Sequence, residues 1–162
     1  MKVAILGYGK MGHIIEKTAL ARGHNIILKI NQNNIDELNI ENLKKADVII
    51  DFSTPESAKT NIILSIDANK PIISGTTGWL NDLKEVKDYC NINNGTFLYS
   101  SNFSLGVNLF FELNKNLAKL MKKHQQYQIN LTEIHHSEKL DAPSGTAICL
   151  AEQIISESNI KN

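Results

Sequence analysis

The sequence predicts an α/β protein built on a parallel sheet, and three observations carry this prediction. Short apolar runs alternate with amphipathic segments over residues 1–103, which is typical of βαβ units. The first run, Lys2 to Leu6, passes directly into a glycine-rich turn and then a helical pattern that stops at Gly23. Residues 104–162 contain two long helical patterns around a single strand pattern. We therefore expect a parallel-sheet domain over 1–103, followed by an incomplete α+β domain over 104–162.

The composition indicates which kinds of binding partner the protein has. The 162 residues carry a formal net charge of zero, so no basic field exists to hold nucleic acid or an anionic membrane. No apolar run is long enough to span a bilayer, and the N-terminus lacks a signal-peptide pattern. Cys90 and Cys149 lie far apart in unrelated contexts, as expected of reduced thiols. We expect a cytoplasmic protein with a small-molecule partner.

The turn after the first strand has the spacing G-x-G-x-x-G. It consists of Gly7, Tyr8, Gly9, Lys10, Met11 and Gly12. Glycines at this spacing permit a tight turn and close approach of the backbone to a pyrophosphate, which the following helix N-terminus stabilises. The setting, with a strand before and a helix after, predicts a dinucleotide site. An ordinary glycine-rich turn is the alternative.

The second strand, Asn25 to Ile30, ends at Asn31. Sites that favour NAD place an acidic residue here to bond the adenosine ribose. The neutral amide does not repel a 2′-phosphate, and Lys10 can supply a positive charge for it. We therefore expect NADPH to bind at least as well as NADH, unless both residues are simply solvated.

The rest of the first domain continues the alternation. We expect a loop with a short helix over Gln32–Lys45, strands over Asp47–Asp51, Pro71–Ser74 and Thr96–Tyr99, and helices over Pro55–Ala68 and Leu80–Asn91. Small polar or glycine-rich segments follow these strands: Phe52-Ser53, Gly75 to Gly78, and Ser101-Asn102-Phe103. Because ligands bind at the carboxyl ends of parallel strands, these segments are expected to surround the cofactor.

The second domain is predicted to begin with an amphipathic helix over Ser104–Lys123. Its apolar side carries Leu109, Phe110, Leu113, Leu117, Leu120 and Met121. A strand over Gln128–Ile134 and a helix from Pro143 to about Ser158 follow. One strand between two helices cannot close a sheet of its own.

The segment Glu133 to Ala147 reads E-I-H-H-S-E-K-L-D-A-P-S-G-T-A and concentrates the reactive groups. It offers two imidazoles and one ammonium, followed by a helix start with Asp141 or Ser144 as N-cap and Pro143 in the first turn. Free N–H groups at such a start form an anion site. The pattern predicts proton transfer beside an anionic substrate, against the alternative of ordinary polar residues and a capped turn. Adjacent histidines on a strand point to opposite faces, which disfavours a metal site.

In the order of its motifs, the chain resembles the 4-hydroxy-tetrahydrodipicolinate reductase (dihydrodipicolinate reductase) family of the diaminopimelate route to lysine. The resemblance rests on GYGKMG, on DFSTPE at Asp51–Glu56, on GTTGW at Gly75–Trp79, on NFSLGVN at Asn102–Asn108, and on the long segment above. It implies a Rossmann-like cofactor domain and a substrate domain, hinged near Ser101–Ser104. It also implies hydride transfer from NADPH or NADH to a cyclic hydroxy-imine dicarboxylate, giving tetrahydrodipicolinate with loss of water.

The resemblance also assigns roles to residues. His135 and Lys139 would be the proton-transfer pair. The substrate carboxylates would be bound by His136, Ser144, Gly145 and Thr146. The nicotinamide half would be held by Gly75, Thr76, Thr77, Ser100, Ser101, Asn102 and Phe103, close to Phe52.

Two departures from the family pattern shape our expectations. Asn31 replaces an acidic residue common in the family, which puts NADH preference in doubt. Family chains also continue through further strands, which build a homotetramer. We therefore expect this chain to bind nucleotide but to turn over substrate poorly and associate irregularly. A nucleotide-binding remnant without catalysis is the alternative; a different imine or aldehyde reductase is disfavoured by the pairing of H-H-x-x-K with P-S-G-T.

Overall fold

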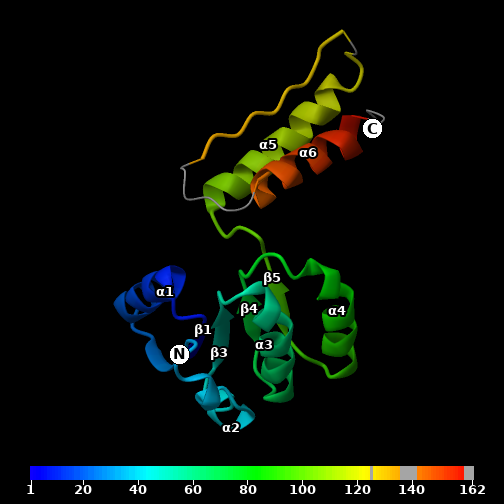
Figure 1. The fold of residues 1–162 in the computed structure, drawn as a ribbon. Coiled ribbons are helices and arrows are strands. Elements are labelled where there is room, and N and C mark those ends of the chain that lie inside the picture. Colours follow the sequence, from blue (N-terminus) through cyan, green and yellow to red (C-terminus); the bar gives the residue numbers. More distant parts are fainter. Residues whose placement is uncertain (125, 136–141, 159–162) are drawn as a thin grey trace. The chain divides into compact units, whose positions relative to one another are not determined.

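The computed structural model describes residues 1–124, 126–135 and 142–158 (Figure 1). The chain divides into two compact units, Met1–Ser100 and Ser101–Asn162. No helix in the described part is long and apolar enough to cross a membrane.

The first unit is organised on a five-stranded sheet. Its strands are β1 (Lys2–Leu6), β2 (Asn25–Ile30), β3 (Val48–Asp51), β4 (Ile72–Ser74) and β5 (Phe97–Tyr99). They lie in the order β2-β1-β3-β4-β5 and every neighbouring pair is parallel, which confirms the predicted sheet. The chain moves one way from β1 to β2 and the other way from β3 onward. This topological switch point between β1 and β3 is where such sheets bind ligands.

Helices connect the strands on both faces of this sheet. They are α1 (Lys10–Ala21), α2 (Ile40–Leu43), α3 (Pro55–Asp67) and α4 (Leu83–Ile92), with 3-10 turns η1 (Ile35–Glu37) and η2 (Leu80–Asp82). Right-handed crossovers place α1 on one side of the sheet and α3 and α4 on the other (Figure 1). As predicted, Pro55 opens α3 and Thr54 caps it, in a reciprocal arrangement with Ser57.

The core of the first unit lies between the sheet and α3. Leu6, Ile49 and Ile72 are fully or almost fully buried there against Ala58 and Ile62. Because side chains alternate along a strand, the residue two positions after a core residue faces the same layer. The same face of β3 and β4 therefore ends in buried polar groups at the carboxyl end of the sheet.

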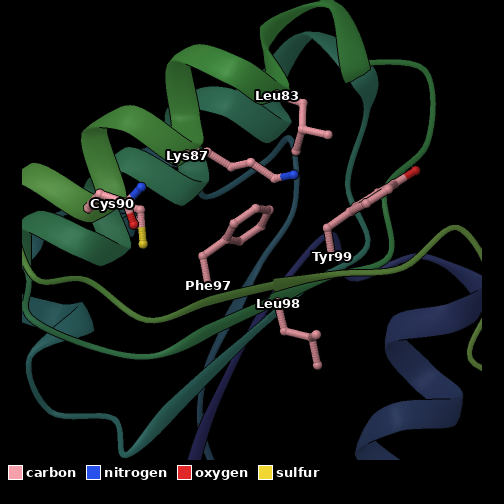
Figure 2. A pocket seen from close by; sticks show the side chains of 7 residues that line it. Leu83, Lys87, Cys90, Phe97, Leu98 and Tyr99 are labelled. Atoms are coloured by element: carbon pink, nitrogen blue, oxygen red, sulfur yellow. The ribbon is translucent and has the colours of Figure 1, made fainter.

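The β5 edge of the sheet carries a shallow apolar groove (Figure 2). It is lined by Leu83, Lys87, Cys90 and Asn91 of α4 and by Phe97, Leu98 and Tyr99 of β5. Figure 2 shows Phe97 and Tyr99 on the α4 side of the strand and Leu98 on the other side. Phe97 and Tyr99 also meet Trp79 edge to face, with ring centroids 5.9 and 5.4 Å apart.

The second unit consists of α5 (Leu105–Met121) packed on α6 (Gly145–Ser158). Its buried apolar residues are Phe111, Ala118, Ala147 and Leu150. Between the helices the Asn114 amide donates to the Leu150 carbonyl at 3.1 Å and to Gln153 Oε1 at 3.1 Å. The described contacts thus bury the Phe111–Ala118 side of α5.

The predicted amphipathic helix is present as α5. Leu109 and Leu113 of its apolar side are each 62% exposed, because α6 covers the side carrying Phe111. Two predictions for this unit were wrong. Residues 128–134 form no strand, since no strand among the described residues of the unit is present to pair with them. The last helix begins at Gly145 rather than Pro143, because Ser144 caps it: Ser144 Oγ accepts from the Ala147 N–H at 3.0 Å.

Candidate active site

The glycine turn after β1 needs glycine at two positions for steric reasons. Gly7 has φ +89°, and a Cβ there would lie 2.1 Å from the Phe52 carbonyl oxygen. A Cβ on Gly12 would lie 2.6 Å from the Gly7 carbonyl oxygen. The N–H groups of Gly7 and Tyr8 donate to the Ile30 carbonyl at 3.0 and 2.9 Å, which ties the turn to the end of β2.

Gly9 differs, because nothing lies within 4 Å of the position its Cβ would take. It is the N-cap of α1, and the first helical bond runs from the His13 N–H to the Gly9 carbonyl at 3.0 Å. The N–H groups of exposed Lys10 and Met11 and of buried Gly12 precede that bond and have no acceptor inside the helix. Open space over a helix N-terminus fits a pyrophosphate, which a side chain on Gly9 would obstruct.

The Tyr8 side chain contacts Glu16 of α1 and Lys29 of β2. Its hydroxyl donates to the carboxylate of Glu16, whose other oxygen accepts from Lys29 Nζ at 3.2 Å. The ring packs against that of His13 at a tilt of 51°, with the centroids 4.2 Å apart, and Lys29 Nζ lies 4.8 Å above it. The hydrogen bond to Glu16 raises the pKa of Tyr8, so the phenol stays neutral.

A cleft lies at the switch point between β1 and β3. It is lined by Gly7, Ile30, Asn31, Gln32, Ile35, Ser53, Thr54, Ser57 and Asn61. Asn31 lines it at the end of β2, where the sequence predicts the adenosine ribose. The Asn31 side-chain oxygen accepts from the Asn33 N–H at 2.8 Å, and its own N–H donates to Asn34 Oδ1 at 2.9 Å. The structure does not place Lys10 among the residues that line this cleft.

The turns after β3 and β4 stack on each other. The Phe52 N–H donates to the Leu6 carbonyl and the Gly75 N–H to the Asp51 carbonyl, both at 2.8 Å, so ladder bonding continues past the strand ends. A Cβ on Gly75 would lie 2.2 Å from the Phe52 ring. Thr76 is buried and Thr77 is exposed.

A buried carboxylate lies beneath these turns, and the sequence motifs did not predict its role. Asp51 is 0% exposed, and its two oxygens accept four hydrogen bonds. The donors are Ser53 Oγ at 2.6 Å and Asn61 Nδ2 at 2.9 Å on one oxygen, and Ser74 Oγ at 2.9 Å and Thr76 Oγ1 at 2.7 Å on the other. Thr76 Oγ1 also accepts from the Ser53 N–H at 2.8 Å. Asp51 therefore joins the turns after β3 and β4 to α3.

The remaining predicted cofactor residues divide between the two units. In the first unit, the Ser100 N–H donates to the Ser74 carbonyl at 3.2 Å, extending the β4–β5 ladder. Ser101, Asn102 and Phe103 belong to the second unit. Asn102 Oδ1 accepts from the N–H of Ser104, the N-cap of α5, at 2.8 Å.

In the second unit the structure brings together His135, Ser144 and a third residue, Glu133, to which the sequence motifs assigned no role. Glu133 Oε2 lies 2.8 Å from His135 Nε2 and 2.5 Å from Ser144 Oγ, and Glu133 Oε1 accepts from the Ser144 N–H at 2.8 Å. Gly145 and Thr146 occupy the first two positions of α6. His136 and Lys139 lie outside the described residues.

A signal for Glu133 existed in the sequence. In an extended chain, residues two apart point to the same side, so E-I-H places Glu133 and His135 together. The contact with Ser144 spans eleven positions and had no local signal.

Comparison with known proteins divides the chain a few residues after Ser100. The model of the dihydrodipicolinate reductase N-terminus matches residues 1–103, and the model of the dihydrodipicolinate reductase C-terminus matches residues 106–162. The chain belongs to the dihydrodipicolinate reductase family. This confirms the resemblance drawn from the motifs.

Named members of the dihydrodipicolinate reductase family are similar over almost the whole chain. The 4-hydroxy-tetrahydrodipicolinate reductase of Christiangramia forsetii is 45% identical over 161 residues, which are 98% of this chain and 66% of that protein. The Rickettsia rickettsii enzyme of the same name is 37% identical over 154 residues, 94% of this chain and 62% of that protein. The chain thus spans somewhat less than two thirds of the length of these relatives.

A solved family structure has the same fold. The dipicolinate-bound dihydrodipicolinate reductase from Paenisporosarcina sp. TG-14 aligns with a TM-score of 0.78 at 26% identity, covering 98% of this chain and 66% of that one. A probable dehydrogenase from Thermotoga maritima aligns with a TM-score of 0.51 at 12% identity over 76% of this chain, a likeness of fold alone.

Proposed function

We propose that the protein reduces 4-hydroxy-tetrahydrodipicolinate to tetrahydrodipicolinate with NADPH or NADH. The observation that carries the proposal is the open helix N-terminus at Gly9, set in a turn where Gly7 and Gly12 are sterically required. Membership of the family supplies the reaction class.

The first unit would hold the nucleotide. The N–H groups of Lys10 and Met11 would bind the pyrophosphate, and Asn31 would bond the adenosine ribose in the cleft at the switch point. Thr76 and Thr77, whose turn is anchored through Asp51, would contact the nicotinamide half. The bound nucleotide supplies the hydride.

The second unit would hold the dicarboxylate. Among the described residues, no acceptor is present for the N–H groups of Gly145 and Thr146, which open a helix and favour an anion. Dipicolinate, bound by the relative from Paenisporosarcina, is a planar dicarboxylate of this kind. His135 would give the proton that balances the charge left on the substrate, with Lys139 as its cationic partner.

Separate variants test the nucleotide half and the substrate half of the proposal. Gly9→Ala should weaken NADPH binding by roughly tenfold or more, because a methyl group would occupy the pyrophosphate cradle. Its free energy of unfolding should change by no more than about 1 kcal/mol, the scale of an N-cap substitution. Nucleotide fluorescence measures the NADPH affinity, and urea titration measures the free energy of unfolding. Unchanged NADPH affinity would contradict the proposed cradle.

Lys139→Ala and His135→Gln should each lower kcat by about a hundredfold or more, the usual effect of losing a general acid. His124→Gln, which alters an exposed histidine of the same unit, is the matched control and should leave kcat unchanged. A coupled assay with freshly generated substrate measures turnover. Tight NADPH binding without turnover of the unaltered chain would instead favour the nucleotide-binding remnant.

A further inference from the structure

One carboxylate in the second unit gathers three donors. Glu133 accepts from the Ser144 N–H, the Ser144 hydroxyl and the His135 ring, all within 2.8 Å. Its side chain is 26% exposed and that of His135 is 39% exposed, so the imidazole is partly open to solvent. A proton-transfer candidate and the start of α6 are thus connected through a single side chain.

The protonation state of Glu133 decides which ring nitrogen of His135 is available. The Ser144 hydroxyl, then the His135 ring and the Ser144 N–H, lower the pKa of Glu133 to about 2. An ionised carboxylate only accepts hydrogen bonds, so His135 Nε2 must carry a proton in both the neutral and the charged imidazole. Nδ1 is then the only ring nitrogen that can exchange a proton with a substrate.

The Ser144 hydroxyl both donates and accepts a hydrogen bond within the second unit. Its Oγ donates to Glu133 and accepts from the Ala147 N–H at 3.0 Å. Ser144 therefore fixes the geometry of the helix start, while the N–H groups of Gly145 and Thr146 have no acceptor inside the helix.

We propose that Glu133 is a positioning residue, which holds the His135 imidazole beside the N-terminus of α6 and leaves Nδ1 as the nitrogen that transfers the proton. The direction of proton transfer, from His135 to the substrate, rests on the proposed function. The positioning of the His135 ring by Glu133 does not. In the step, the His135 imidazolium loses its Nδ1 proton to the reduced substrate and becomes neutral imidazole. The ring then regains a proton from water.

The positioning is tested without turnover, by NMR of the whole chain carrying ¹⁵N-labelled histidine. The Nε2–H proton of His135 should exchange with water at least roughly tenfold more slowly than that of exposed His124. Glu133→Gln should abolish this protection, because an amide offers one acceptor oxygen to three donors. Glu133→Asp keeps the charge but is too short to reach both partners, and it should also lose the protection. Equally fast exchange in the unaltered chain and in Glu133→Gln would overturn the proposal.

The matched control is Glu152→Gln, which removes an exposed carboxylate from α6 itself and should leave the His135 signal unchanged. Backbone amide shifts of α6 show whether a variant keeps the helix. If Glu133→Gln disturbs α6, the comparison rests on Glu133→Asp, whose charge still stabilises the helix N-terminus.

Kinetics then show whether Glu133 acts through His135. Glu133→Gln should lower kcat by roughly tenfold to a hundredfold, the scale of misplacing a reacting group, while the Kd for NADPH stays unchanged. In a His135→Gln background the same substitution should have no further effect on kcat, because residues that act as a unit are not additive. Multiplicative losses would overturn the proposal. Absence of turnover in the unaltered chain would count against the proposed function, and the exchange measurement would still decide the role of Glu133.

Discussion

Removal of the buried carboxylate of Asp51 should destabilise the first unit strongly. In Asp51→Ala the buried hydroxyl groups of Ser74 and Thr76 lose their acceptor. The half-buried Ser53 hydroxyl still accepts from Asn61 at 3.0 Å and can turn its hydrogen to Ser57 Oγ, 3.0 Å away. A buried hydroxyl without an acceptor costs about 1–3 kcal/mol. Two of them give an expected loss of about 2–6 kcal/mol, a large part of the 5–15 kcal/mol that roughly holds a domain folded.

Asp51→Asn should lower the free energy of unfolding by less than Asp51→Ala does, because the new amide can still form hydrogen bonds with the surrounding groups. The Asn61 amide nitrogen can only donate, so the new carbonyl oxygen must stay on its side. The new amide then faces Ser74 and Thr76. Both hydroxyl oxygens can accept from the new amide, but both lose the acceptor of their own hydrogen. Because each hydroxyl keeps a hydrogen bond, the expected loss is below that of Asp51→Ala, at about 1–3 kcal/mol.

Trp79 makes the measurement direct. It is the only tryptophan of the chain, it is 3% exposed, and its Nε1–H donates to the Thr76 carbonyl at 2.7 Å. Urea titration followed by tryptophan fluorescence therefore reports on the turn that Asp51 anchors. Asp88→Asn, at an exposed carboxylate 3.9 Å from Lys84, is the control and should stay within about 0.5 kcal/mol. Unfolding of Asp51→Ala at the same free energy as the unaltered chain would refute the reasoning.

Three further predictions concern the cofactor site and the second unit. Asn31→Asp should shift the ratio of NADPH to NADH affinity toward NADH by about fivefold or more, because like charges near 4 Å repel by about 1 kcal/mol even in water. Fluorescence titration of both nucleotides measures this ratio. An unchanged ratio would show that the adenosine ribose lies elsewhere. Gly7→Ala should lower the free energy of unfolding by about 3 kcal/mol, because the new Cβ would lie 2.1 Å from the Phe52 carbonyl oxygen at a φ of +89°. A urea midpoint equal to that of the unaltered chain would contradict this prediction. The lowered pKa of Glu133 means that its stabilising contacts are fully present above its usual pKa of 4.5 and are lost as the pH falls through about 2. The Ser144 amide shift should titrate near that lower value, and a midpoint near 4.5 would show that the contacts do not form.

The sequence by itself determined the elements of the first unit and the place of its candidate site. Apolar runs too short for helices, each followed by glycine or small polar residues, specify strands whose carboxyl ends meet at one edge of a parallel sheet. The glycine spacing after β1 specified the cradle, because a backbone with φ near +89° at Gly7 and a helix N-terminus at Gly9 are local properties.

Only the tertiary structure decided which side chains meet. Asp51 accepts from Ser74 and Thr76, 23 and 25 positions away, once β3 and β4 lie side by side. Ser144 reaches Glu133 across eleven positions. The helical period shows that α5 has an apolar side but not which side a partner covers, and α6 covers the side with Phe111. The strand expected over 128–134 failed for the same reason: a strand is completed by a neighbour, and periodicity within one segment carries no information about whether that neighbour is present.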